Sequence, residues 1–348
     1  MIKVGINGFG RIGRIFFRAY LDYYRRCKIM RVQPNFVITA VNNPLKKGQT
    51  VKSFTHLLKY DSVHGKLRNN IEAFDSHFMI DGLKVDFWKE TDPAQINWSD
   101  SGVSIVVDST GVFKTKEALS KHLKGSVKRV IMSAPGEDLD GTFVMGVNDH
   151  DYDPLKHVII SNASCTTNCL APLAKILDEA FGIEHGLVST CHSVTNDQSL
   201  TDNIHDDLRR ARAAFQSMIL TKTGAAKAVG EVLPNLKGKL DGMAIRVPTL
   251  DVSVIDANFI LKKDTSAEEV NNLLREKAKG DYLGILGVED EELVSVDFVG
   301  DTRSSIVDSK YTKVMNKRML KVMSWYDNEM GYSSRMVDMI KMIIDKGV

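Results

Sequence analysis

Short apolar runs alternate with helix-patterned stretches through the first half of the chain. Residues 2–6 are strand-like, residues 8–13 are rich in glycine, and residues 12–20 carry apolar side chains at helical spacing. Further apolar runs follow at 36–41, 103–107, 127–132 and 157–160, separated by helix-patterned stretches such as 115–123. Buried parallel strands are continuously apolar, so this half predicts a doubly wound, mostly parallel α/β sheet of the Rossmann type. We expect residues 23–33 to form a basic, extended connection.

The pattern changes after about Ser164. Longer strand-like runs with alternating side chains occupy 186–190, 243–247, 252–261 and 293–298, and several of them follow one another without room for a crossover helix. Such runs predict a mostly antiparallel sheet with helices on one face, which is an α+β arrangement. A capping box at 265–268 begins an amphipathic helix that Gly280 ends, and an apolar stripe from Met336 to Ile344 indicates a core-facing final helix.

Length favours two domains, because 348 residues exceed what a single core usually serves. We expect a nucleotide-binding domain over residues 1–164, completed by the C-terminal helix over 329–348, and a catalytic domain over residues 165–328.

Composition narrows the partners and the compartment. The net charge is +2 and 43% of the residues are hydrophobic, so no charge excess directs the chain to nucleic acid or to a membrane. No apolar run approaches the ~20 residues of a membrane span, and the start lacks the pattern of a signal peptide. Four scattered cysteines without a CxxC pair indicate free thiols rather than disulfides or a metal site. We therefore expect a cytoplasmic protein with no bound metal.

Gly8, Gly10 and Gly13 form a G-x-G-x-x-G motif that follows a strand and opens a helix. The first glycine permits a tight turn, the second lets the backbone approach a pyrophosphate, and the third lets helix and strand pack closely. The motif therefore predicts a dinucleotide site. The acidic residue expected after the second strand is replaced by Asn43, where we place the contact with the adenosine ribose. We expect NAD, because an amide can still hydrogen-bond to the ribose. NADP stays an alternative, because an amide carries no charge that would repel a 2′-phosphate.

Cys165 lies in the segment SNASCTTNC, between a strand-like run and the helical pattern at 170–177. A helix N-terminus favours a thiolate, so this thiol is a candidate nucleophile. Cys169 falls one helical turn later and is expected to be structural, and Cys27 and Cys191 are expected to be incidental thiols.

A thiol nucleophile requires a base, and His192 ends the strand-like run before SVTNDQ. Spacing alone leaves open whether His192 meets Cys165. Arginines suited to phosphate binding follow at Arg209, Arg210, Arg212 and Arg246, although arginines on helix faces are usually solvated.

Seven motifs occur in order along the chain: INGFGRIGR, KYDSVHGK, SNASCTTNC, DLRRARAA, TGAAKAV, RVPT and WYDNEMGYSSR. They resemble the phosphorylating glyceraldehyde-3-phosphate dehydrogenase family, and its bacterial-type members in particular. The resemblance implies oxidation of glyceraldehyde 3-phosphate to 1,3-bisphosphoglycerate with reduction of NAD(P), in glycolysis or gluconeogenesis. It also implies a Cys165 thioester, inorganic phosphate as second substrate, and a homotetramer.

The resemblance implies roles for individual residues. Cys165 would be the nucleophile and His192 its base. Anion sites would be formed by Thr195 and Arg246 for the substrate phosphate and by Ser164, Thr166, Thr223 and Gly224 for inorganic phosphate, with Arg210 near both. The cofactor would be held by Arg11 and Ile12 at the pyrophosphate, Thr110 and Ser133 near the nicotinamide, Asn328 at the carboxamide and Tyr332 beside it.

Two other functions compete with this one. Erythrose-4-phosphate dehydrogenase shares the cysteine and the histidine but hydrolyses its thioester, and Thr195 together with TGAAKAV favours the triose enzyme. A non-catalytic redox or RNA-binding use of the fold would not require the full set of Cys165, His192, Arg210 and Arg246. Asn43 for the family's usual Asp and Met330 for its usual Trp are departures that leave the catalytic motifs intact.

Overall fold

The computed structural model describes residues 1–348, and its internal contacts divide the chain into two units. Unit 1 comprises Met1–Phe143, Asp149–Ala163 and Ser333–Val348, and unit 2 comprises Val144–Asn148 and Ser164–Tyr332. None of the helices combines the length and the apolar character that crossing a lipid bilayer would require.

Unit 1 is built on a nine-stranded sheet with the order β10-β11-β9-β8-β1-β2-β7-β6-β5. Its strands are β1 Ile2–Asn7, β2 Phe36–Asn42, β5 Ile71–Ala73, β6 His77–Ile80, β7 Leu83–Trp88, β8 Ile105–Asp108, β9 Arg129–Met132, β10 Gly141–Thr142 and β11 Ile159–Ser161. All pairs from β10 to β7 are parallel, and β6 and β5 add antiparallel strands at one edge. The predicted doubly wound, mostly parallel sheet is confirmed.

The helices of unit 1 are α1 Arg11–Met30, α2 Val51–Lys59 and α3 Lys116–Ser120. The last helix, α7 Met330–Lys346, belongs to unit 1 from Ser333 onward. A small β3 Tyr60–Asp61 and β4 Gly65–Lys66 pair lies apart from the main sheet. Short 3-10 turns occupy η1 Pro93–Gln95, η2 Trp98–Ser101 and η3 Asp149–Asp151.

The expected extended connection over 23–33 is wrong, because α1 continues to Met30. The rings of Tyr20 and Tyr23 lie 5.5 and 5.2 Å from the ring of Phe36, and Cys27 is buried one turn further on. These positions prolong the apolar stripe of the helix, while Arg25, Arg26 and Lys28 face solvent. The helix ends where Arg31 adopts a left-handed conformation, with φ of 56°.

Unit 2 is built on an eight-stranded sheet with the order β13-β14-β12-β15-β19-β17-β16, in which β18 also pairs with β19. Its strands are β12 Ile183–His192, β13 Ile219–Lys222, β14 Leu240–Arg246, β15 Ser253–Leu261, β16 Leu286–Glu289, β17 Ser305–Asp308, β18 Lys313–Met315 and β19 Met319–Tyr326. Most pairs are antiparallel, as predicted, but β12 with β14 and β16 with β17 are parallel.

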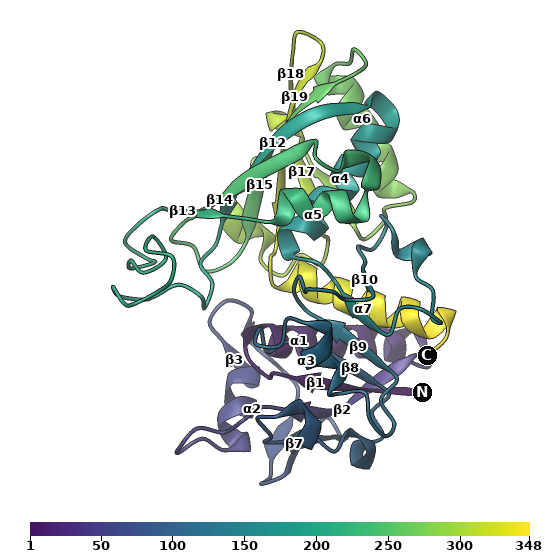
Figure 1. The fold of residues 1–348 in the computed structure, drawn as a ribbon, viewed down its shortest axis with the longest axis vertical. Coiled ribbons are helices and arrows are strands. Elements are labelled where there is room, and N and C mark those ends of the chain that lie inside the picture. The colour runs from purple at the N-terminus through teal and green to yellow at the C-terminus, as the bar shows by residue number, and fades with distance from the viewer. The chain divides into compact units, whose positions relative to one another are not determined.

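The helices of unit 2 are α4 Cys165–Phe181, α5 Ala225–Val232 and α6 Ala267–Lys279, with short 3-10 turns at η4 Pro234–Leu236, η5 Ser295–Phe298 and η6 Ser309–Tyr311. Helix α4 packs against β12, β15, β17 and β19, and α5 packs against β14 (Figure 1). The chain between β12 and β13, residues 193–218, extends away from this sheet (Figure 1).

The strand expected over 293–298 is wrong, because that segment forms the turn η5. Only Phe298 is fully buried, and its ring stacks on Trp325 with centroids 5.5 Å apart, whereas Val294 and Val296 are exposed. One buried residue in this run is enough to anchor a turn but does not give the alternation of a half-buried strand.

Candidate active site

The glycine turn between β1 and α1 has the geometry that a pyrophosphate requires. Gly8 has φ of 89°, and a Cβ on it would lie 2.7 Å from the backbone N of Thr110. A Cβ on Gly13 would meet the carbonyl oxygen of Gly8, whereas nothing lies within 4 Å of the Cβ position of Gly10. The first turn of α1 has no acidic residue and no side-chain cap. The turn is thus tight at Gly8 and Gly13 and open at Gly10, which fits a dinucleotide phosphate.

Arg11 and Ile12, predicted at the pyrophosphate, are the first two residues of α1. The Arg11 guanidinium forms an ion pair with Asp61 of the YDSVHG segment. Burial alone would raise the pKa of Asp61, but the backbone N–H groups of His64 and Val63 and the charge of Arg11 together lower it to about 2. Arg11 therefore has a carboxylate partner within unit 1, and its contact with a pyrophosphate stays a prediction.

Asn43 follows β2 directly and anchors the glycine turn. Its Oδ1 accepts a hydrogen bond of 3.0 Å from the backbone N–H of Phe9, and its Nδ2 donates to the carbonyl of Pro44 at 3.0 Å. Lys46 and Lys47 follow shortly after Asn43 in the sequence, and both residues are exposed. This anchoring role is one that the sequence did not indicate, and the ribose contact of Asn43 stays a prediction.

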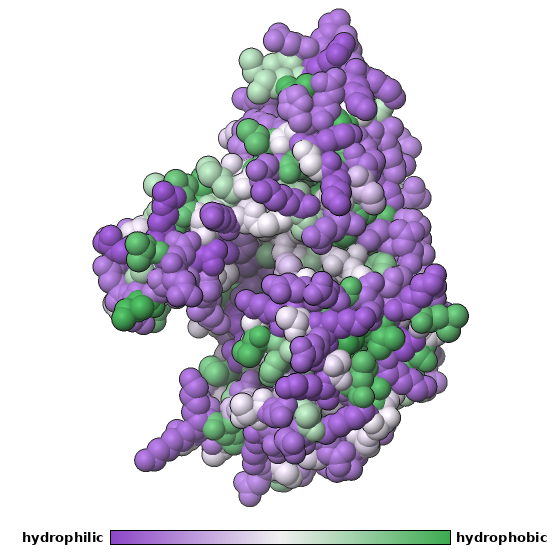
Figure 2. Space-filling model, viewed as in Figure 1, coloured by the Kyte–Doolittle hydropathy of each residue, from purple (hydrophilic) through white to green (hydrophobic).

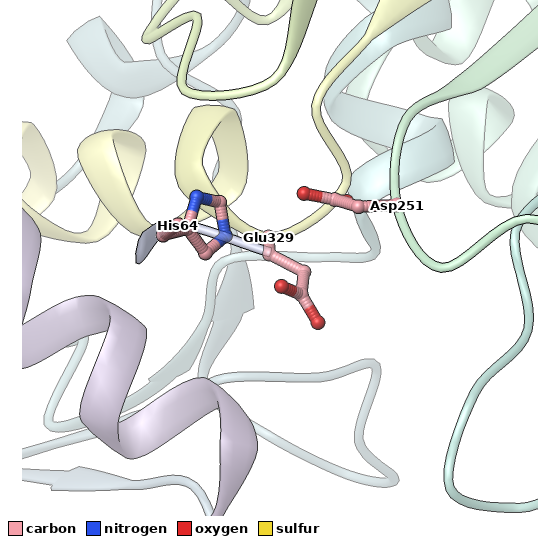
Figure 3. Close-up of side chains that lie close together, drawn as sticks. All are labelled: His64, Asp251 and Glu329. Atoms are coloured by element: carbon pink, nitrogen blue, oxygen red, sulfur yellow. The ribbon is translucent and has the colours of Figure 1, made fainter. Parts of the chain in front are cut away.

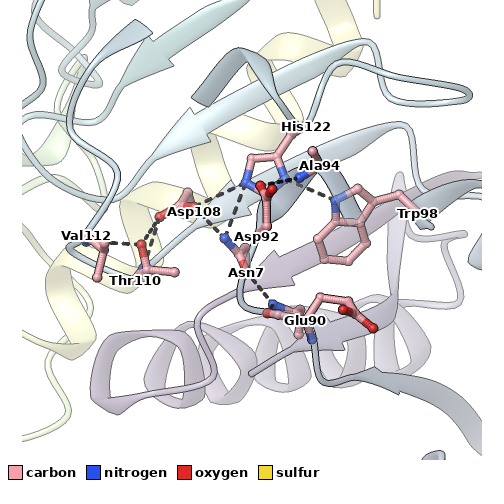
Figure 4. A network of polar contacts seen from close by, with 10 residues as sticks. Asn7, Glu90, Asp92, Ala94, Trp98, Asp108, Thr110, Val112 and His122 are labelled. Carbon is pink, nitrogen blue, oxygen red and sulfur yellow. Dashed lines mark hydrogen bonds and ion pairs between the residues drawn. The ribbon is translucent and has the colours of Figure 1, made fainter. Parts of the chain in front are cut away.

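A buried polar network fixes the end of β8, where Asp108 and Thr110 lie (Figure 4). Asp108 Oδ1 accepts from the hydroxyl of Thr110 at 2.6 Å, and Oδ2 accepts from Asn7 Nδ2 at 2.7 Å. Trp98 Nε1 donates to His122 Nδ1 at 3.1 Å, so the imidazole proton is on Nε2, 3.3 Å from Asp108 Oδ2. Thr110 is therefore held by the Asp108 carboxylate, which Asn7 and His122 fix in turn.

Ser133, the other residue predicted near the nicotinamide, follows β9, the neighbour of β8. Its backbone N–H donates to the carbonyl of Asp108 at 2.9 Å. Parallel strands align their carboxyl ends, so Thr110 and Ser133 share one edge of the sheet, which is the usual ligand edge of such folds.

Cys165 is the first residue of α4, as the sequence predicted. Ser164 caps this helix, because its hydroxyl accepts from the backbone N–H of Thr167 at 3.0 Å. Cys165 is partly exposed, and its Sγ lies 3.5 Å from Nε2 of His192. Burial raises the pKa of Cys165, and the charge of Arg246 and hydrogen bonds with Thr166 oppose that rise only in part. The resting group is a thiol rather than the thiolate that the helix start suggested.

His192 is placed by strand pairing. The parallel register of β12 with β14 sets His192 opposite Arg246, and Arg246 Nη1 lies 2.5 Å from Nδ1 of His192. The carbonyl of Ser193 lies 2.8 Å from the same Nδ1. Burial, followed by the positive charge of Arg246, lowers the pKa of His192 to about 3. The imidazole is neutral at physiological pH, and with its proton on Nδ1 donated to the Ser193 carbonyl, Nε2 is the nitrogen that can take a proton from Cys165.

Tyr326 supports this pair and was not singled out from the sequence. Its hydroxyl lies 2.9 Å from the hydroxyls of both Thr166 and Thr190, and its ring meets the His192 ring edge-on. Burial raises the pKa of Tyr326 well above its usual range, so the hydroxyl stays protonated. The inward alternation along β19 was the available signal, since Leu320, Val322, Ser324 and Tyr326 all face the same way.

Asn328 and Tyr332, predicted around the nicotinamide carboxamide, are both buried and belong to unit 2. Asn328 Oδ1 accepts hydrogen bonds from the hydroxyls of Ser253 and Ser193, at 2.7 and 3.0 Å. The sequence analysis did not single out these two serines.

The residues predicted to bind phosphate lie on several segments of unit 2. Arg210 pairs with Asp197 at 2.6 Å, and its Nε donates to the hydroxyl of Thr221. The other positions are Thr195, in a turn closed by Gln198, and Thr223 with Gly224, at the start of α5. The contacts bring together Cys165, His192 and Arg246, whereas Thr195, Arg210, Thr223 and Gly224 form no direct hydrogen bond with these three.

The remaining cysteines differ from Cys165. All four are free thiols. Cys169 is buried against the hydroxyl of Ser305, and burial raises its pKa to about 12, in keeping with the structural part expected for it. Cys27 is buried in α1, and burial also raises the pKa of Cys191 in β12.

Asp251 is a buried carboxyl group of unit 2 and lies close to Glu329 (Figure 3). Burial, and then the negative charges of Asp327 and Glu329, raise the pKa of Asp251 to about 9. Asp327 is tied down as an acceptor, because its carboxylate takes hydrogen bonds from the backbone N–H groups of Met330 and Gly300. Asp251 therefore carries a proton at neutral pH.

A Rossmann sheet with an open glycine turn, in one chain with a helix-start cysteine facing a neutral histidine, defines a nicotinamide-dependent dehydrogenase that uses a thiol. Two family models match: the NAD binding domain of glyceraldehyde 3-phosphate dehydrogenase over residues 2–116, and the C-terminal domain of the same enzyme over residues 164–328. The chain therefore belongs to the glyceraldehyde-3-phosphate dehydrogenase family.

Individual relatives agree over the full length. The chain is 51% identical to glyceraldehyde-3-phosphate dehydrogenase 1 of Bacillus cereus, with 100% of each chain covered. It is also 51% identical to the glyceraldehyde-3-phosphate dehydrogenase of Geobacillus stearothermophilus, with 100% of this chain and 99% of the relative covered. The expected family, fold class and NAD cofactor are confirmed.

The raised pKa of Asp251 predicts how stability changes with pH. The unfolded chain loses this proton near pH 4 and the folded chain near pH 9, so the group lowers stability progressively as pH rises between those values. Asp251→Asn removes the effect. The free energy of unfolding of this variant, relative to the wild type, should increase by about 1 kcal/mol per pH unit from about pH 5 to pH 8.

Urea unfolding at a series of pH values measures this difference. Glu291→Gln removes an exposed carboxylate and serves as the control, with an offset that stays constant with pH. A constant offset for Asp251→Asn as well would show that Asp251 is ionised in the folded protein.

Proposed function

We propose that the protein catalyses the phosphorylating oxidation of glyceraldehyde 3-phosphate to 1,3-bisphosphoglycerate with NAD, as a step of glycolysis or gluconeogenesis. The observation that carries this proposal is the 3.5 Å contact between Cys165 Sγ and His192 Nε2, with Arg246 beside the imidazole. Full-length relatives that carry the glyceraldehyde-3-phosphate dehydrogenase name support it.

The first step forms a covalent bond between Cys165 and the aldehyde. Neutral His192 takes the thiol proton at Nε2 while Sγ attacks the carbonyl carbon, and the same proton returns to the carbonyl oxygen to give a thiohemiacetal. The positive charge of Arg246 lowers the pKa of Cys165 and so favours the thiolate during the attack. Since the thiol and the imidazole are both neutral at rest, charge separates only when the aldehyde is present.

The second step oxidises the carbon bound to sulfur. His192 Nε2 removes the hydroxyl proton of the thiohemiacetal while hydride leaves the same carbon, and a thioester results. NAD, when bound, supplies the acceptor for that hydride. Phosphate oxygen then attacks the thioester carbonyl, the carbon–sulfur bond breaks, and Sγ leaves to recover its proton from His192. The products are an acyl phosphate and the free thiol.

Two anion sites explain why phosphate completes the reaction. We assign Arg246 and Thr195 to the substrate phosphate and Ser164, Thr166, Thr223 and Gly224, with Arg210, to inorganic phosphate. Support comes from the helix starts that carry these residues: Ser164 and Thr166 flank Cys165 at the start of α4, and Gly224 caps α5. Backbone N–H groups in such positions favour anions.

The cofactor residues are proposed to lie in both parts of the sequence. We assign Gly8, Gly10, Arg11, Ile12 and Gly13 to the pyrophosphate, Asn43 to the ribose, and Thr110, Ser133, Asn328 and Tyr332 to the nicotinamide end. In this assignment residues 1–164, completed by 329–348, bind the nucleotide, and residues 165–328 carry the acyl chemistry. The open Cβ position of Gly10 and the uncapped start of α1 support the pyrophosphate assignment.

A cytoplasmic homotetramer is also proposed. The strands β12, β13 and β14 expose Leu187, Leu220 and Met243. The segment 193–218 adds further apolar side chains, among them Ile204 and Leu208, which are 98% and 81% exposed, and Figure 2 shows green apolar atoms on this projecting part. Exposed apolar side chains gathered in this way favour a covering partner, and a second copy of the chain is the partner that closed symmetry supplies.

Phosphate dependence is the direct test of the proposed reaction. Steady-state NADH formation from glyceraldehyde 3-phosphate should require added phosphate, and NAD should give a higher kcat/KM than NADP. Cys165→Ser should lose at least about 10³-fold in kcat, because a serine hydroxyl lacks the acidity and nucleophilicity of a thiol. Turnover that proceeds equally well without phosphate would instead assign the hydrolytic alternative.

Sedimentation equilibrium tests the assembly. The wild type should sediment with four times the mass of one chain, and Leu187→Asp should dissociate it, because a charge would be desolvated at the interface. Leu155→Asp is the control, since Leu155 is also an exposed leucine, 91% against 68% for Leu187, but lies in unit 1 on a different surface segment. A wild type of single-chain mass would contradict the proposal.

A further inference from the structure

Asn328 lies between β19 and α7, and its amide is held by two buried hydroxyl groups. Its Oδ1 is 2.7 Å from Ser253 Oγ and 3.0 Å from Ser193 Oγ. Ser193 and Ser253 are 0% and 1% exposed, and Asn328 itself is 7% exposed. The two serines come from the chain after β12 and from the start of β15, so three separate segments meet at one amide oxygen.

The hydrogen bonds among these residues set the direction of the amide. The backbone N–H of Ser193 donates to Ser253 Oγ at 3.1 Å, which leaves the Ser253 proton for Asn328. A flipped amide would place its NH₂ group against both hydroxyls and leave their protons without acceptors. Leaving a buried donor unpaired costs about 1–3 kcal/mol, so one orientation is strongly preferred.

In that orientation the NH₂ group of Asn328 points away from the serines. Its Nδ2 has no hydrogen-bond partner within the protein. A buried amide that is anchored through its oxygen and open through its nitrogen is prepared to donate to an acceptor from outside the chain.

We propose that Ser193 and Ser253 are positioning residues that fix the Asn328 amide as a donor to the nicotinamide carboxamide oxygen, and thereby select the face of the ring that receives hydride. This inference rests on the proposed function, in which Asn328 meets the carboxamide. The carboxamide lies to one side of the nicotinamide ring, so a donor fixed in space allows one ring orientation. Turning the ring over would move the carboxamide away from Asn328 and present the opposite face.

Ser193 also links this amide to the base. Its hydroxyl holds Asn328, and its carbonyl lies 2.8 Å from Nδ1 of His192. One residue therefore positions both the group that removes the proton and the group that orients the hydride acceptor. Substitution of Ser193 by Ala removes only the hydroxyl and leaves the carbonyl contact with His192 in place.

Direct binding and stereochemistry test the proposal. In Ser253→Ala and Ser193→Ala, the NAD dissociation constant measured by calorimetry should rise about three- to ten-fold, the equivalent of one hydrogen bond. With glyceraldehyde 3-phosphate deuterated at the aldehyde carbon, the wild type should place deuterium on one face of C4 of the nicotinamide. The double variant should place a measurable share on the other face.

A buried serine outside the site provides the control. Ser324 is fully buried in β19 and pairs with Ser305 at 2.8 Å, so Ser324→Ala costs a comparable hydroxyl contact without touching Asn328. It should leave the NAD dissociation constant and the single-face transfer unchanged. Ser253→Thr keeps a hydroxyl and should restore both. A purely structural role of the serines would lower the melting temperature without changing the face of transfer.

The outcomes separate this inference from the proposed function. Wild-type protein without phosphate-dependent turnover would remove the proposed function, while the NAD affinities of the variants would still report on Asn328. An active wild type whose serine variants bind NAD normally and keep single-face transfer would overturn only the inference. If Ser253→Ala does not fold, Ser193→Ala alone decides, because its backbone contacts are retained.

Discussion

The parallel pairing of β12 with β14 is the constraint on which the site depends. In a sheet whose other pairs are mostly antiparallel, this register sets His192 opposite Arg246 at the ends of two neighbouring strands. Helix α4 packs on the same sheet and begins at Cys165, so the thiol meets the imidazole from the helix side. A shift of one residue in the register would turn His192 to the other face of the sheet and separate the pair.

Burial determines the charge state of this pair. It raises the pKa of Cys165 and lowers the pKa of His192, so the resting site holds a thiol and a neutral imidazole. The charge of Arg246 adds to the lowering of the His192 pKa and opposes the raising of the Cys165 pKa. Arg246 is also the only fixed charge in direct contact with the imidazole. The structure thus keeps a reactive pair uncharged at rest, next to the positive charge of Arg246.

Much of this arrangement could be predicted from local sequence. The glycine turn, the helix start at Cys165 and the strand that ends at His192 are all encoded within a few neighbouring residues. The length of α1 was missed because its basic residues hid the aromatic stripe formed by Tyr20 and Tyr23. Ser193 and Ser253 were missed because their partner, Asn328, is 135 and 75 residues away, and no local pattern indicates which distant strands pair.

The central claim is that oxidation passes through a thioester on Cys165, and rapid mixing without phosphate tests it most directly. With NAD and glyceraldehyde 3-phosphate, the account predicts a burst of one NADH per chain and an acyl adduct on the Cys165 peptide in the mass spectrum. Added phosphate should then remove the adduct and start steady turnover. Sustained phosphate-free turnover without a burst, or an adduct on another residue, would contradict the account.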